Sequence, residues 1–127
     1  MTFRKQNMLT FEVLGEPVGK ERPRKGVNRY FYTPARTKAY EQHVALSALA
    51  EINAVKGEKP FIPSGPVTIE IHVHTPKTTP DLDNVLKSVI DGLNGIAYRD
   101  DSQVVYILAR RMHSQQPRVK VWVGEEA

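Results

Sequence analysis

The chain has 127 residues, no cysteine and a formal net charge of +4. The absence of cysteine excludes disulfides, thiolate metal sites and a cysteine nucleophile. No apolar run is long enough to span a membrane, and the first residues lack the apolar core of a signal peptide. We therefore expect a soluble cytoplasmic protein without a membrane partner, built as one domain over residues 1–127.

The positive charge is concentrated near the N-terminus. Residues 1–40 carry nine Lys or Arg against three Glu, whereas the rest of the chain carries nine against eleven acids. A first strand is predicted over Met8 to Leu14, where apolar residues alternate loosely before Gly15. The sequence thus predicts a basic N-terminal part attached to a faintly acidic body.

Residues 15–33 are rich in Gly, Pro and positive charge and show neither a helical nor a strand period. We expect a long loop there, and long loops in compact domains are more often functional than idle. Basic residues interleaved with aromatic ones suit a phosphate backbone and exposed bases. The alternative is a solvated loop that aids solubility. The candidate DNA-binding residues are Lys20, Arg22, Arg24, Lys25 and Arg29.

The first helix is predicted to begin with Thr33 as N-cap and Pro34 in the first helical position, and to end at Gly57. Its apolar residues recur at helical spacing: Tyr40, Val44, Ala48, Leu49, Ile52 and Val55. A half-buried strand is predicted next, over residues 67–74, because four β-branched residues there alternate with polar ones.

The second helix is predicted over Pro80 to Leu93, with an apolar stripe of Leu82, Val85, Leu86, Val89, Ile90 and Leu93. Two further strands are predicted over Val104 to Arg110 and Arg118 to Val123, with a turn between them. The order strand, helix, strand, helix, strand, strand predicts a two-layer α+β domain, with two helices on one face of a small mixed four-stranded sheet.

Four carboxylates flank the second helix. Asp81 and Asp83 stand beside its start, and Asp100 and Asp101 stand where the next strand begins. If Asp81 to Asp83 is extended, both side chains leave the same side of the backbone, and the neighbouring strand would bring the second pair beside them. Such a cluster is unfavourable without a cation. The natural candidate is a hard divalent ion, held by carboxylates and substrate phosphates.

Each of these residues also has an ordinary structural role to consider. An Asp before a helix is typically an N-cap, and an Asp pair is typical of turns. Lys87 could meet charge developing on a phosphate, or only form a salt bridge to Asp83 one turn earlier. His72 and His74 share one strand face at a spacing that zinc can use, but no third ligand is evident, and Glu70 on that face is a candidate fourth acid.

Together these motifs resemble the RusA-type Holliday-junction resolvases, over most of the chain. Residues 15–24 resemble the family's N-terminal basic segment, and Tyr32-Thr33-Pro34 with Tyr40-Glu41 resembles its first-helix entry. The catalytic half of the family is matched by Pro80-Asp81-Leu82-Asp83-Asn84, Lys87, Asp91, Leu93-Asn94, Asp100-Asp101 and Gln103-Val104, a combination that is specific although each piece alone is weak.

The resemblance implies a RusA-like fold and a homodimer that cleaves four-way junction DNA by paired symmetric nicks, with Mg²⁺ or Mn²⁺, in recombination and repair. Many relatives are carried by phages and prophages. The family's essential acids fall on Asp81, Asp83 and Asp101, with Asp100 as a further candidate metal ligand, and its catalytic-site lysine falls on Lys87. Two alternatives remain: a nuclease that prefers flaps or other branches, and a non-catalytic branched-DNA-binding module whose aspartates only cap a helix.

Overall fold

The structure is a computed structural model that describes residues 3–21, 24–25, 31–32 and 34–126. For residues 3–7, 24–25 and 31–32 only the backbone is described. The elements are, in chain order, β1 (Phe3–Leu14), β2 (Arg24–Lys25), β3 (Phe31–Tyr32), α1 (Ala35–Ala54), β4 (Val67–His74), α2 (Leu82–Gly92), the short 3₁₀ helix η2 (Asp101–Gln103), β5 (Val104–Met112) and β6 (Arg118–Glu126).

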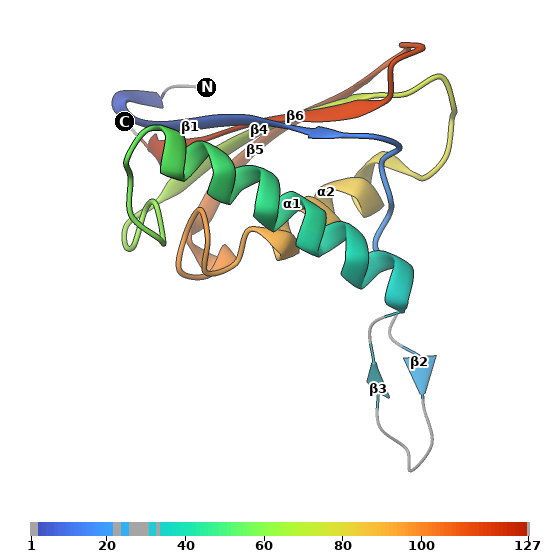
Figure 1. The fold of residues 1–127 in the computed structure, drawn as a ribbon, viewed down its shortest axis with the longest axis horizontal. Helices are drawn as coiled ribbons and strands as arrows, with labels where there is room; N and C mark the ends of the chain where they lie inside the picture. Colours follow the sequence, from blue (N-terminus) through green and yellow to red (C-terminus); the bar gives the residue numbers. More distant parts are fainter. Residues whose placement is uncertain (1–2, 22–23, 26–30, 33, 127) are drawn as a thin grey trace.

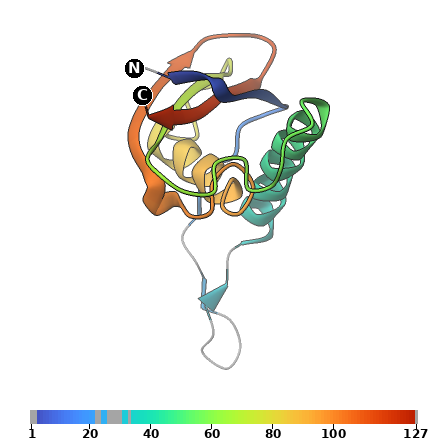
Figure 2. The same cartoon turned by 90° about the vertical axis from the view of Figure 1, so that its left-hand side faces the viewer.

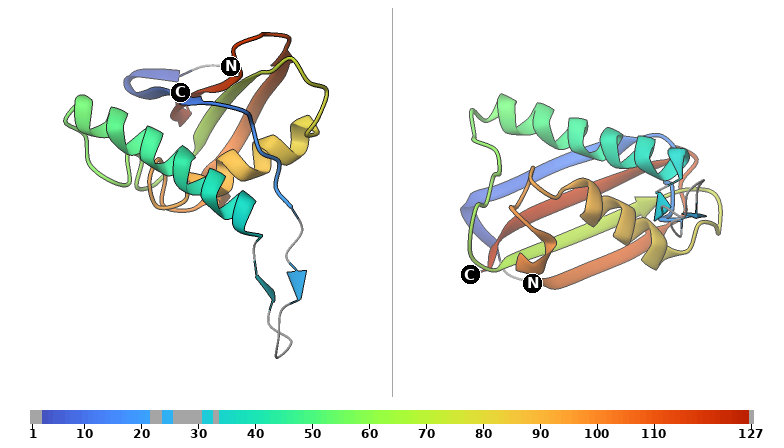
Figure 3. Two further views of the ribbon diagram at one scale, coloured as in Figure 1. Left: turned by 45° about the vertical axis from the view of Figure 1, so that its right-hand side comes forward. Right: turned by 90° about the horizontal axis from the view of Figure 1, so that it is seen from below.

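The main sheet has four strands in the order β1-β6-β4-β5. Strand β6 pairs antiparallel with both β1 and β4, whereas β4 and β5 are parallel. Figure 1 shows the sheet as one layer with α1 and α2 both on the same face, and Figure 3 shows the two helices crossing that face side by side. The predicted α+β layout, two helices on a mixed four-stranded sheet, is confirmed.

The core lies between the helices and this sheet face. Strands β1, β4 and β6 contribute every second residue to it, as the period-2 pattern predicts for a half-buried sheet, whereas β5 has no fully buried residue. Burying this apolar surface is the main favourable contribution to folding. Its fully or nearly fully buried members include Leu9, Phe11, Val13, Tyr40, Val44, Ala48, Ile52, Val67, Ile69, Ile71, Val73, Val85, Val89, Leu93, Val119, Val121 and Val123.

Several predicted boundaries were wrong. Two strands are longer than expected: the edge strand β1 already begins at Phe3, and the inner strand β6, which is paired on both sides, continues to Glu126. Helix α1 begins at Ala35 with Pro34 as its N-cap, and the predicted cap Thr33 lies outside the described residues. Val55, expected in the apolar stripe, follows the end of α1 and is 54% exposed.

The region expected to be a loop contains a two-stranded ribbon. Arg24 pairs with Tyr32 and Lys25 with Phe31, in antiparallel register. The ribbon projects away from the two layers beyond the start of α1 (Figures 1 and 2). Strands of two residues carry no usable alternation, which is why the sequence pattern did not predict them.

The unit β4-α2-β5 positions the candidate site. Because β4 and β5 are parallel, α2 must return across the sheet between them, as in other crossover connections. The start of α2 therefore lies at the C-terminal ends of β4 and β5, and its end lies near their starts. Arg111, near the end of β5, confirms this by donating hydrogen bonds to the carbonyls of Lys77 and Pro80, just before α2.

Candidate active site

Asp81 and Asp83 lie at the start of α2, and both are exposed. Asp81 occupies the N-cap position with extended dihedral angles, but its side chain accepts no hydrogen bond from the helix. Asp83 lies within the first turn, so the condition of one extended segment from Asp81 to Asp83 is not met. The sequence signals for a helix start are strong at this point, so the chain is already helical from Leu82 onward. Both carboxylates still lie at the positive end of the helix dipole, where negative charge is stabilising.

Asp100 and Asp101 differ in their surroundings. Asp100 Oδ2 accepts a hydrogen bond of 3.0 Å from Ser102 N, while Gln103 Oε1 accepts one of 3.1 Å from Asp100 N, so this residue caps η2. The hydrogen bonds from Ser102 lower the pKa of Asp100 below its usual value. Within the described part of the chain, the Asp101 carboxylate has only one hydrogen bond, a long one of 3.4 Å from Asn94 Nδ2. The Asp100 carboxylate is thus occupied in capping η2, whereas the Asp101 carboxylate is available to a ligand.

The two acidic pairs do not meet within one chain. Asp81 follows the C-terminal end of β4, whereas Asp101 precedes the start of the parallel strand β5, so the 11-residue helix α2 separates them. A helix of that length spans about 15 Å. Among the described residues, no group of three or more potential ligand side chains could hold a metal ion. The expected convergence failed because neighbouring strands in a parallel pair place the end of one and the start of the next on opposite edges.

Lys87 lies on the exposed side of α2, one turn after Asp83. No ion pair joins Lys87 to Asp83 in the described part of the chain, although an i,i+4 salt bridge was one interpretation of the spacing. The ammonium group of Lys87 is therefore available to an anionic ligand at this end of the helix.

Lys20 belongs to the basic segment, and its ammonium group contacts both helices. Its Nζ lies 2.6 Å from Glu41 Oε2 on α1 and 3.2 Å from Asp91 Oδ2 on α2, and its side chain is only 16% exposed. Burial disfavours the charged form, but the two carboxylates outweigh burial and raise the pKa of Lys20 above 10.5. Its charge is paired within the protein, so the structure gives no support to Lys20 as a phosphate contact, and that assignment stays a prediction.

The segment around Lys20 is also held against the first turns of α2. Lys20 N donates to Asn84 O at 2.8 Å, and Ser88 Oγ donates to Val18 O at 2.7 Å. Gly19 packs so closely that a Cβ there would lie 2.9 Å from Pro80 Cβ. The base of the basic segment and the acidic end of α2 therefore form one packed unit, and this is the physical reason for a glycine at position 19.

Sequence reasoning missed Arg111 and Asn94. Arg111 fixes the carbonyl of Pro80 directly before Asp81, and Asn94 lies against Asp101. Arg111 lies beyond the predicted end of this strand, and a strand pattern does not tell which loop such a side chain reaches. The only sequence signal for Asn94 was its place among the residues that resemble the catalytic half of the RusA family.

The remaining predicted residues fall into two groups. Arg22 and Arg29 lie outside the described residues, and of Arg24 and Lys25 only the backbone is described, in β2. His72 Nε2 lies 2.6 Å from Glu70 Oε2, and its ring packs edge-on against Trp122. Because no third ligand joins the two histidines within the described ranges, the ordinary hydrogen-bonded role is the one the structure favours over zinc.

Comparison with known proteins identifies the family of this chain. The family model of endodeoxyribonuclease RusA matches residues 15–124. The chain belongs to the RusA endodeoxyribonuclease family. RusA proteins are endonucleases that act on Holliday junctions, and this chain is accordingly a junction-resolving nuclease of that family. The match therefore favours the nuclease over the non-catalytic module.

The chain is also similar to an uncharacterized protein of Bacillus subtilis (strain 168), YqaN. The two are 32% identical over 142 aligned positions, which cover 92% of this chain and 96% of the relative. RusA resolvases generally depend on a divalent metal. The described part of the chain contains no helix long and apolar enough to cross a membrane.

The first prediction uses thermal stability to distinguish the structural roles of Asp81 and Asp100. Asp81→Ala should leave the melting temperature unchanged or raise it, because Asp81 makes no cap hydrogen bond and has a charged neighbour in Asp83. A capping Asp would lose about 1 kcal/mol. Asp100→Ala, the matched control, should lower the melting temperature, because it removes the cap of η2. Thermal unfolding without metal measures both, and a clear loss for Asp81→Ala would restore the helix-cap interpretation.

The second prediction concerns Lys20. Lys20→Met should lower the free energy of unfolding by about 1–3 kcal/mol at neutral pH, because two half-buried carboxylates lose their cation. Since the folded-state pKa of Lys20 is raised, its contribution is complete below the ordinary value of 10.5 and is lost as the pH rises through the folded-state value. Denaturant unfolding should show the gap to wild type closing at high pH. Lys38→Met, an exposed control on α1, should change little; equal effects at both positions would contradict the buried ion pair.

Proposed function

We propose that this protein resolves Holliday junctions by paired symmetric nicks, as a homodimer that uses Mg²⁺, with Mn²⁺ as a substitute. The observation that carries the proposal is the pair of exposed carboxylates, Asp81 and Asp83, at the start of α2, with Lys87 one turn further on and no competing partner for any of them in the described residues. These are the positions on which the resemblance places the family's essential acids and lysine.

The separation of the acidic pairs supports a dimer. Asp101 lies too far from Asp81 and Asp83 for one chain to surround a cation, yet its carboxylate is free to bind one. Oxygen ligands of this kind are what a hard divalent ion prefers. A second copy could supply the missing carboxylate, if its Asp101 reached the start of the first copy's α2.

Strand β5 offers the surface for such a contact. It is an edge strand, and four consecutive residues on it are large, apolar and 44–60% exposed: Val105, Tyr106, Ile107 and Leu108. Exposed apolar edge strands invite pairing with another chain. The apolar residues point to both faces of the sheet, so a partner strand bearing the same pattern would cover them on both.

An antiparallel pairing of β5 with β5 of a second copy would bring Asp101 of one copy close to Asp81 and Asp83 of the other. It brings the start of one β5, where Asp101 lies, to the end of the other, where Arg111 holds Pro80 next to Asp81. Each of two equivalent sites would then combine Asp81 and Asp83 of one protomer with the partner's Asp101. A two-fold axis suits a four-way junction, because two related sites can cut two opposing strands.

The residues have distinct proposed roles. Asp81, Asp83 and Asp101 would hold the cation, with Asp100 keeping η2 in shape beside Asp101. A bound divalent cation would polarise the scissile phosphodiester and lower the pKa of a ligated water. Lys87 would face the phosphate and stabilise the charge that develops on it. Arg24 and Lys25 of the ribbon, with Arg22 and Arg29, would bind backbone phosphates of the junction arms.

The third prediction tests the reaction. Purified protein should nick a mobile four-way junction at paired, symmetry-related positions when Mg²⁺ or Mn²⁺ is present, and should not nick it with EDTA. Asp83→Asn should bind the junction with unchanged affinity but cut it at least about a hundredfold more slowly, as expected when a metal ligand is lost. Product mapping on denaturing gels, with flap and three-way substrates in parallel, distinguishes a resolvase from a general branch nuclease. Binding without cleavage in either metal would contradict the proposal.

The fourth prediction tests where the sites lie. Asp81→Asn and Asp101→Asn should each be inactive alone, but a mixture that exchanges subunits should regain single nicks, because one of the two sites in a mixed dimer then has all its carboxylates. If each chain carried a complete site, no mixed dimer would contain an intact one, and the mixture would remain inactive. As a companion, Ile107→Glu should convert the dimer to an inactive monomer by analytical ultracentrifugation, whereas Leu46→Glu, 65% exposed on α1, should not.

A further inference from the structure

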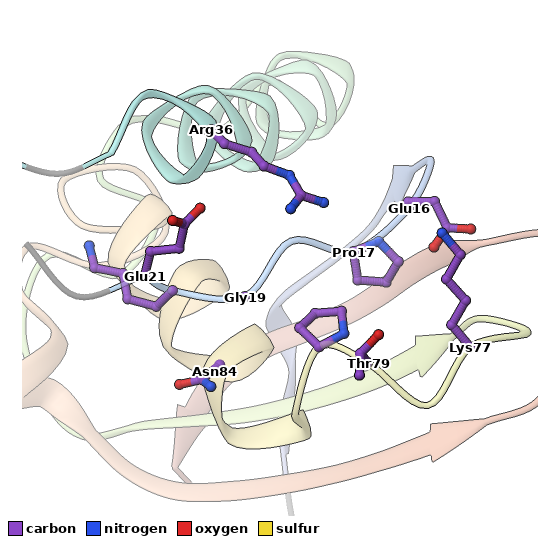
Figure 4. A pocket seen from close by; sticks show the side chains of 10 residues that line it. Glu16, Pro17, Gly19, Glu21, Arg36, Lys77, Thr79 and Asn84 are labelled. Atoms are coloured by element: carbon purple, nitrogen blue, oxygen red, sulfur yellow. The ribbon is translucent and has the colours of Figure 1, made fainter.

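A cavity of about 350 Å³ lies beside the acidic end of α2 (Figure 4). That volume is at the lower end of the range for small-molecule sites. Its wall includes Pro80 and Asn84, which flank Asp81 and Asp83 in sequence, and Arg36, which enters from the first turn of α1. The cavity wall therefore directly adjoins the two aspartates along the chain.

The charge balance of the lining argues against a site for a bare phosphate. Lys20 lies in the wall, but Glu41 and Asp91 already neutralise it. The other charged side chains of the lining are of both signs, with Arg36 and Lys77 beside Glu16 and Glu21. A site for an anion alone would carry an excess of positive charge, so the lining suits a ligand that has both hydrogen-bond donors and acceptors.

The side chains available to such a ligand are polar and uncommitted. Arg36, Thr79 and Asn84 make no side-chain hydrogen bond or ion pair within the described part of the chain. Figure 4 shows these side chains around the cavity, with the ring of Pro17 beside them. Pro17 and Pro80 supply flat apolar surface. Apolar surface with a few placed amide and guanidinium groups is the combination that holds a nucleobase taken out of its stack.

We infer that this cavity takes one unstacked nucleotide of the substrate strand, next to the phosphate at Asp81 and Asp83. The inference rests on the proposed function and adds a specificity site to it. Asn84 and Arg36 contact the edge of the base, and the prolines contact its face. A four-way junction suits such a site, because base pairs at the branch point are already weakened and a base there is easily displaced.

The test measures base unstacking and needs no cleavage. A four-way junction carrying 2-aminopurine at the branch-point nucleotides is bound by the protein in EDTA, and its emission is compared with that of the free junction. Thr79→Phe fills the cavity, and Thr78→Phe adds the same ring to the neighbouring exposed residue that does not line it. Asn84→Ala removes a polar contact without adding volume, and circular dichroism confirms that each variant is folded.

The expected result is a rise in emission for wild type and Thr78→Phe that is lost in Thr79→Phe and reduced in Asn84→Ala. With Mg²⁺, Asn84→Ala should also cut about tenfold more slowly at the preferred positions and spread its nicks over neighbouring ones. No rise for wild type, or an equal rise in Thr79→Phe, would overturn the cavity assignment even if cleavage is normal. A cavity-dependent rise without any nicking would instead support the cavity and contradict the proposed nuclease reaction.

Discussion

The parallel pairing of β4 and β5 is the constraint on which the site depends. It forces α2 to return across the sheet, and it places the acidic residues at the start of α2 and those before β5 on opposite edges. One chain therefore carries two separate acidic pairs about one helix length apart. In the proposed dimer, those pairs would come together from different chains.

Lys20 fixes the other side of the site. With Glu41 and Asp91 it joins the segment before the ribbon to both helices, at 2.6 and 3.2 Å. Half-buried charges are tolerated only when paired, so the three residues are interdependent. The same segment packs Gly19 against Pro80 and places Lys20 N on Asn84 O. The segment up to Lys20 and the start of α2 therefore form one packed unit.

The sequence predicted most of the fold but only part of the site. The spacing of apolar residues identified both helices and all four strands of the main sheet. The pattern is clearest in Val67 to Val73, where apolar residues alternate as in a strand, and in α2, where they recur at helical spacing. Strand direction was not encoded in those patterns, and the convergence of Asp81 with Asp101 failed for that reason. The role of Lys20 was missed because a basic motif does not show that Glu41 and Asp91 lie opposite. The difference between Asp100 and Asp101 was likewise invisible, since it depends on the hydrogen bond from Ser102.

In the proposed dimer, the distribution of the carboxylates over two chains also avoids repulsion between them in the folded monomer. Carboxylates placed close together repel, and a folded monomer with three or four of them in one cluster would lose stability at neutral pH. At the start of α2 the helix dipole partly compensates Asp81 and Asp83. In the proposed dimer the third carboxylate arrives only when β5 buries the apolar edge from Val105 to Leu108, so hydrophobic burial offsets the added repulsion. A cation then removes the remaining repulsion, which means that dimerisation and cation binding should reinforce each other, each tightening as the other proceeds.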